Sequence, residues 1–258
     1  MVTNNDIKIA HHWFHSFVRQ HYSPDSFIQQ NIRLKEDHTL RVCSNIKTIA
    51  TNLHVSESDK ALAELMALFH DLGRFEQFTK YKTFSDLRSI NHAELSVLLL
   101  KKHKILAFLP KQEQELIYEV ITYHNLHHLP EIHDETVLFF SQLLRDADKL
   151  DVFHVLLHHY QQTSEEKNPA LDLHYPNSPG YSSVIIQQLQ QGQSTTWAMV
   201  QNLNDMKLLQ LSWIYDINFQ PTLEEIKKRG YIDAFFSLLP DDDIMNKIHQ
   251  QITQVLTR

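Results

Sequence analysis

Six histidine and aspartate residues stand at positions expected to face the interior of a helical protein. Neutral imidazole and carboxylate groups are ligands for borderline divalent metals, and 18 of the 258 residues are histidines. A buried carboxylate without a partner is costly, and a bound cation would offset that cost. The alternative is that each residue lies at the edge of the core and makes one ordinary hydrogen bond. The six residues are His38, His70, Asp71, His92, His124 and Asp148.

The elements that must position these side chains are amphipathic helices. Apolar residues recur at steps of three and four, so His38 points along a buried face and Asp148 points inward beside Leu144. His70 extends the apolar face of its helix, which Gly73 is expected to end. Side chains from five helices can converge only inside a bundle. The predicted helices of this part cover about residues 6–21, 36–53, 56–72, 92–108, 112–124 and 135–159, and another begins at Ser23 and Pro24.

Residues 74–91 lose the helical periodicity and mix polar, aromatic and basic side chains. This composition and length predict an ordered surface loop of a kind that is often functional. The loop supplies Lys80, Lys82 and Arg88 as candidate contacts for a negatively charged ligand, although most lysine and arginine side chains are simply solvated.

The domain organisation is predicted from a cluster of residues that favour turns. Residues 163–180 hold three of the eight prolines together with asparagine, serine and glycine, which predicts a linker. We therefore expect a catalytic domain over 1–162 and a helical extension over 181–258 that packs on it. The extension is expected to have helices at about 185–191, 197–216, 223–239 and 242–256.

Composition favours an all-α fold and limits the classes of partner. Only 4 glycines occur, too few for many tight turns or for glycine-rich phosphate loops. The single cysteine, the absence of a signal-like start and the short apolar runs predict a cytoplasmic protein without a membrane segment. A net charge of -7 disfavours binding of long nucleic acid, so a small phosphorylated partner, nucleotide-like in character, is expected.

Three segments carry a resemblance to a known family. The segment LMALFHDLGRFEQF contains a His-Asp doublet at His70 and Asp71, EDHTLRV contains His38, and LLRDADKLDVF contains Asp148. In order and spacing these segments resemble the HD superfamily of metal-dependent phosphohydrolases over nearly the first 155 residues. More narrowly, HDLGRFEQF with TFSDLRSINHAELS and YHN resembles a branch of HD hydrolases with the pattern HDxGRFEQ.

The resemblance implies an all-α HD-domain helical bundle with one or two divalent metal ions, from among Mn, Fe, Co, Ni, Zn and Mg. His38, His70, Asp71 and Asp148 would ligate one ion, and Asp146 is the competitor for the last place. In the dinuclear members of the family two further histidines hold a second ion and the doublet's aspartate bridges the pair. The residues that match those histidines here are His92 and His124.

Hydrolysis of a phosphate monoester or diester by metal-activated water is the expected reaction. Positive charge must meet the phosphoryl oxygens, and Arg74 after the doublet and Lys149 beside Asp148 are the expected catalytic side chains together with Asp71. The cyclic-diguanylate phosphodiesterase pattern HHE…DGxGYP is absent. The acidic residue that alarmone hydrolases carry after the doublet is replaced by Arg74 and Phe75, and Glu76 ranks below the activated water as a base.

Two other functions are compatible with the same residues. A regulatory domain could keep the metal or a nucleotide and lack turnover. A dinuclear-iron oxygenase could use the same scaffold. The complete set of expected ligands favours the hydrolase.

Overall fold

The fold is all-α, as predicted. A computed structural model describes residues 2–163, 165–172 and 175–257, and within these ranges helices occur and strands do not. The chain divides into two compact units, 1–151 and 152–258, and the division falls inside the long helix α7 (Glu135–Gln161). The predicted linker at 163–180 begins after this helix. Positions 164, 173 and 174 of that linker, and the end positions 1 and 258 of the predicted domains, lie outside the described residues.

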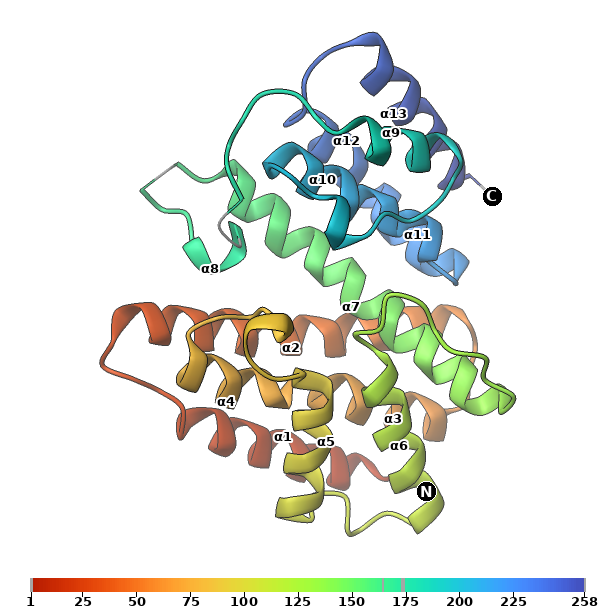
Figure 1. Cartoon of the computed structure of the whole chain (residues 1–258). Helices are drawn as coiled ribbons and strands as arrows, with labels where there is room; N and C mark the ends of the chain where they lie inside the picture. The colour runs from red at the N-terminus through yellow and green to blue at the C-terminus, as the bar shows by residue number, and fades with distance from the viewer. Residues whose placement is uncertain (1, 164, 173–174, 258) are drawn as a thin grey trace. The chain divides into compact units, whose positions relative to one another are not determined.

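The first unit, coloured red to green in Figure 1, is a helical bundle around an aromatic and aliphatic core. Helix α3 packs against α1, α2 and α6, and α4 packs against α2 and α5. Phe14, Phe69, Phe75 and Phe78 are fully buried between them. The elements are α1 (Asn4–Arg19), α2 (Ser26–Asn52), α3 (Glu57–Phe69), α4 (Leu72–Tyr81), the 3-10 turn η1 (Asp86–Arg88), α5 (His92–His103), α6 (Lys111–Tyr123) and the first part of α7.

Helix α2 is longer than predicted because two expected helices are one. The helix runs from Ser26 to Asn52, and Asp25 caps it with a side chain that accepts a hydrogen bond from the Ile28 amide at 3.0 Å. Ile28 and Ile32 are buried and continue the apolar face of the downstream half, and neither proline nor glycine interrupts the helix. The predicted start at Ser23 and the separate helix from residue 36 were therefore wrong.

Helix α4 occupies the first part of the predicted loop. Leu72, Phe75 and Phe78 recur at every third position and are fully buried, so this segment has an apolar helical face that its polar neighbours conceal in the sequence. Gly73 lies inside the first turn of α4 and does not end the preceding helix. Its role is close packing, because a Cβ atom there would overlap the backbone carbonyl of His92.

The second unit, coloured green to blue in Figure 1, consists of short helices. The predicted helix over 197–216 is divided into η2, α10 and η3, and the predicted helix over 223–239 breaks at Gly230, whose φ of 65° suits glycine. The elements after α7 are α8 (Pro169–Asp172), α9 (Ser183–Gln190), η2 (Trp197–Met199), α10 (Leu203–Ser212), η3 (Trp213–Asp216), α11 (Gln220–Lys228), α12 (Tyr231–Phe236) and α13 (Asp243–Val255).

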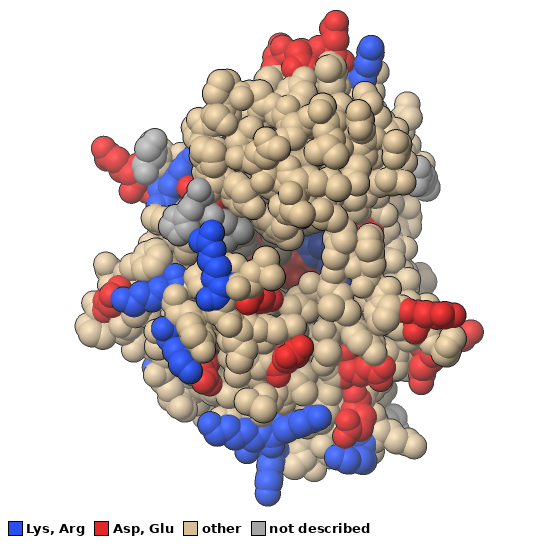
Figure 2. Space-filling model, in the orientation of Figure 1, with Lys and Arg blue, Asp and Glu red and all other residues tan. Residues whose placement is uncertain are grey.

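Charged side chains are distributed differently over the two units on the face shown in Figure 2. Basic and acidic side chains are interspersed on the first unit, and the visible surface of the second unit carries few of either sign.

Among the described helices, none combines the length and the apolar content needed to cross a bilayer.

Candidate metal centre

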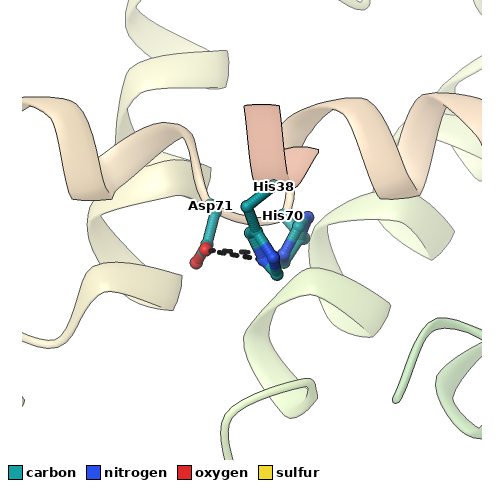
Figure 3. A group of neighbouring side chains, drawn as sticks. All are labelled: His38, His70 and Asp71. Carbon is teal, nitrogen blue, oxygen red and sulfur yellow. Dashed lines mark ion pairs between the residues drawn. The ribbon is translucent and has the colours of Figure 1, made fainter. Parts of the chain in front are cut away.

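The structure brings the six predicted side chains together inside the first unit. His70 follows the last residue of α3, Asp71 stands at the break before α4, and His124 follows the last residue of α6. His38 lies in the middle of α2 and His92 is the first residue of α5, where Asn91 caps the helix. Asp148 lies on α7 with its side chain 21% exposed, and the other five residues are buried. Figure 3 shows His38 and His70 turned toward the Asp71 carboxylate.

The Asp71 carboxylate lies between two pairs of histidines. Its Oδ2 atom is 3.4 Å from Nε2 of His38 and 3.6 Å from Nε2 of His70. Its Oδ1 atom is 3.3 Å from Nε2 of His92 and 3.7 Å from Nε2 of His124. One carboxylate therefore presents a different oxygen to each pair, and we call these pairs the His38/His70 half and the His92/His124 half.

Of the three aspartates on α7, Asp148 is the one directed at the His38/His70 half. Its Oδ1 atom is 3.2 Å from Nε2 of His38 and 3.6 Å from Nε2 of His70. Asp151 contacts the opposite nitrogen of His38, and Asp146 is buried. This geometry agrees with the choice of Asp148, and its role as a ligand stays a prediction.

Two of the histidines are oriented by the backbone of the helix that they end. Nδ1 of His70 donates to the Ala67 carbonyl at 2.7 Å, and Nδ1 of His124 donates to the Ile121 carbonyl at 2.6 Å. Because a carbonyl only accepts, Nδ1 must carry the proton in both rings. In the neutral form, each Nε2 then offers a lone pair to the cluster.

The other two histidines are oriented by carboxylates. Nδ1 of His38 lies 2.7 Å from Oδ2 of Asp151, and Nδ1 of His92 lies 2.7 Å from Oδ2 of Asp86. A carboxylate behind the ring fixes the tautomer and raises the basicity of the opposite nitrogen. All four histidines therefore turn Nε2 toward Asp71.

The donor atoms fit a divalent cation. Nε2 of His38 and Nε2 of His70 are buried and make no hydrogen bond, although carboxylate oxygens lie near both. Nε2 of His92 and Nε2 of His124 are only 3.0 Å apart, which is unfavourable for two neutral rings unless a proton or a cation lies between their lone pairs. Buried polar atoms without partners call for an explanation, and imidazole with carboxylate is a donor set for borderline divalent metals.

Burial and charge act in opposite directions on the titration of these rings. Burial and the Lys35 ammonium disfavour the charged form of His38, but the carboxylates of Asp148, Asp151 and Asp71 outweigh them and raise its pKa to about 10. Without metal, His38 therefore carries a proton at neutral pH, and a cation must displace this proton on binding.

His92 behaves in the opposite way. Burial, followed by the positive charge of Arg74, lowers the pKa of His92 to about 3 despite the favourable contact with Asp86. Burial opposes ionisation of Asp71, but Lys35 and the surrounding histidines hold its pKa well below the usual range. At neutral pH the Asp71 carboxylate is therefore charged and His92 is neutral, and these are the forms in which such side chains bind a metal ion.

Sequence reasoning missed Lys35. Its Nζ atom lies 2.6 Å from Oδ2 of Asp71, and it lies one helical turn before His38 on the same face of α2. That spacing was a signal available in the sequence. The ammonium also lies 5.6 Å from the centre of the Phe84 ring, and Arg74 lies 5.8 Å from the same ring.

The basic residues proposed from the sequence occupy different places. Arg74 lies at the cluster, with Nε 3.5 Å from Oδ1 of Asp71 and without a hydrogen bond, while Nη1 donates to the Phe84 carbonyl at 2.6 Å. Lys149 is half-buried on α7 next to Asp148. Lys80 near the end of α4, Lys82 after it and Arg88 in η1 are exposed, and Glu76 on α4 is half-buried.

Histidines and aspartates from separate helices of the bundle thus meet at a His-Asp doublet, in groups that could hold a metal ion. A family model described as HD domain matches residues 36–156, a range that contains all six side chains. The match assigns residues 36–156 to an HD domain. No curated protein and no solved structure matched the chain in the comparisons. The narrower HDxGRFEQ branch stays a prediction.

Proposed function

We propose that the protein hydrolyses a phosphate monoester or diester of a small, nucleotide-like molecule, with one or two divalent ions at the Asp71 cluster. The observation that carries this proposal is the Asp71 carboxylate, whose two oxygens face separate pairs of histidine nitrogens. Such an arrangement suits two ions that share one carboxylate. Clamping of attacking and leaving oxygens by paired ions is a common basis of phosphoryl hydrolysis.

The chain's own residues would divide the work as follows. His38, His70, Asp71 and Asp148 would hold one ion, and His92 and His124 would hold the other with Asp71. A bound divalent ion supplies Lewis acidity, which acidifies water and polarises phosphate oxygens.

Positive charge from the chain would complete the site. Lys35 lies beside Oδ2 of Asp71 and Arg74 lies beside Oδ1. Both side chains are therefore close enough to contact phosphate oxygens at the cluster. Lys149 remains a candidate for the same task from α7. The net charge of -7 supports a small phosphorylated partner and not a long nucleic acid.

Replacing His124 with alanine is expected to reduce the metal content from two ions per chain to one. The substitution removes a nitrogen from the His92/His124 half and leaves the His38/His70 half intact. His92→Ala should do the same. Metal analysis of the purified variants measures the ratio. His128→Ala is the matched control, because His128 is an exposed histidine in the same segment. An unchanged number of metal ions per chain in both variants would show that these two histidines have a structural role and are not ligands.

A substrate panel tests the reaction. Nucleoside mono-, di- and cyclic phosphates and p-nitrophenyl esters are incubated with the protein loaded with Mn, Co, Ni, Fe, Mg or Zn. We expect phosphate release that a chelator abolishes and added metal restores. A metal-loaded protein that is inert across the panel would contradict the hydrolase proposal and favour a regulatory domain. Oxygen consumption by the iron form would instead indicate an oxygenase.

A further inference from the structure

Two carboxylates lie behind the cluster, and each contacts one of its histidines. We propose that Asp151 and Asp86 are positioning residues that set the metal affinity of the two halves separately. Asp151 acts on the His38/His70 half through His38, and Asp86 acts on the His92/His124 half through His92. This inference rests on the proposed function, since it presupposes that the cluster binds metal.

Asp151 is fixed between α2 and α7. It is 1% exposed, and its Oδ2 atom is 2.7 Å from Nδ1 of His38. The Arg41 guanidinium makes a bidentate contact with the same carboxylate, with Nε 2.6 Å from Oδ1 and Nη2 3.1 Å from Oδ2. Arg41 lies on the same helix as His38, three residues later, so one guanidinium clamps the carboxylate against the ring. Asp151 can therefore neither rotate away nor be replaced by water without loss of the Arg41 contacts.

Asp86 holds His92 from the loop that follows α4. Its two oxygens lie 2.7 and 2.9 Å from Nδ1 of His92. Gln77 donates to Oδ1 at 2.8 Å, Asn125 donates to Oδ2 at 3.1 Å, and Arg74 donates to Oδ1 at 3.2 Å. Every one of these neighbours is a donor, so the position requires an acceptor on both oxygens. The carboxylate connects α4, α5 and the end of α6 at one point.

The four histidines thus fall into two kinds. His70 and His124 donate hydrogen bonds to backbone carbonyls of their own helices, and substitution of another side chain does not remove these acceptors. His38 and His92 depend on a carboxylate from another element, and each half contains one histidine of each kind. Loss of an outer carboxylate typically costs about 10 to 100-fold in metal affinity. Because the two carboxylates touch different rings, the losses should be confined to different halves.

Asp86→Asn and Asp151→Asn test this separation. Each substitution keeps the size of the side chain, removes its charge, and replaces one acceptor with an amide donor. Metal-free full-length protein is titrated with Co²⁺ alone and followed by calorimetry and visible absorption. We expect two binding events in the wild type, of which each variant weakens one by about 10 to 100-fold and leaves the other unchanged.

A double-substitution cycle assigns each loss to its half. In the His92→Ala background, Asp86→Asn should have no further effect on the remaining Co²⁺ event, whereas Asp151→Asn should weaken that event by the same factor as in the wild type. A general loss of fold would instead weaken every Co²⁺ event that is present in each background. Asn125→Ala, which removes one donor to Asp86 without touching His92, should weaken the same event as Asp86→Asn but by less.

The outcomes separate the two proposals. A wild type that binds no Co²⁺ overturns the metal centre, and the inference with it. A wild type with two events that neither asparagine variant changes leaves the metal centre standing and overturns the inference. Equal weakening of both events by each variant also overturns the inference, because the two carboxylates would then not act on separate halves. Circular dichroism and thermal melting of each variant establish that the helices are retained.

Discussion

Replacing Asp71 with alanine is expected to abolish metal retention and hydrolysis while the chain stays helical. Asp71 faces both halves of the cluster, so its loss removes an oxygen donor from each. Substitution of an outer partner of a ligand already costs up to about 100-fold, and the loss of a shared ligand should exceed that. Activity below about 1% of the wild type is therefore expected. Of the remaining five residues, Asp148 alone carries an oxygen donor. Its Oδ1 atom lies 3.2 Å from Nε2 of His38 and 3.6 Å from Nε2 of His70, and its carboxylate also groups with His124 within 4.8 Å.

The measurement is metal content of freshly purified protein together with Co²⁺ titration and phosphate release. Asp37→Ala is the matched control, because Asp37 is an exposed aspartate on α2 directly before His38. Asp71→Asn keeps the shape and should lose most of the affinity as well, since an amide carries no charge. Normal metal content in Asp71→Ala would refute the assignment of the whole centre.

The second large effect is expected from Gly73→Ala. In an exposed helix, alanine in place of glycine gains up to about 1 kcal/mol. At position 73 the new Cβ would overlap the His92 carbonyl oxygen and lie 2.9 Å from the Ser96 amide nitrogen and 3.0 Å from Cβ of Leu95. Two of these three atoms belong to the backbone of α5, so no side chain can move aside. Overpacking costs about 1 to 3 kcal/mol and sometimes more, which outweighs the gain in helix propensity.

The consequence should extend to the metal centre. Helix α5 must move away from α4 to admit the methyl group, and His92 is the first residue of α5. In Gly73→Ala we therefore expect a lower midpoint of denaturation and weaker Co²⁺ binding at the His92/His124 half. Denaturant unfolding and Co²⁺ titration measure the two effects. An unchanged or higher midpoint would show that the α4 and α5 backbones are not in close contact.

The all-α class and the convergence of the six residues were accessible from the sequence for a physical reason. Helical periodicity is a local signal, and it places His38 and Asp148 on buried faces without knowledge of the partner helix. Boundaries were less accessible. Gly73 resembles a helix stop until the proximity of α5 is known. Ser23 with Pro24 resembles a helix start, although Asp25 is the residue that caps the helix.

The surroundings of the cluster were the least accessible part. Asp86 lies in a 3-10 turn without periodicity, and its importance depends on donors from α4, α5 and the end of α6 that come close only in the folded chain. Arg74 was expected to meet the substrate, and the structure shows that one of its nitrogens also anchors the Phe84 carbonyl. Contacts of this kind depend on tertiary structure, so a single sequence contains no pattern for them.

The His-Asp doublet straddles an interruption between two helices. Asp71 has φ of -103° and ψ of 17°, outside the helical region, whereas His70 before it is still helical. In an uninterrupted helix adjacent side chains diverge by about 100° and could not share a cation. The same two residues within a continuous helix would thus be unable to bind one cation together. The doublet therefore depends on the break between α3 and α4. An insertion or substitution that joined the two helices into one would separate the two side chains, although both residues would still be present.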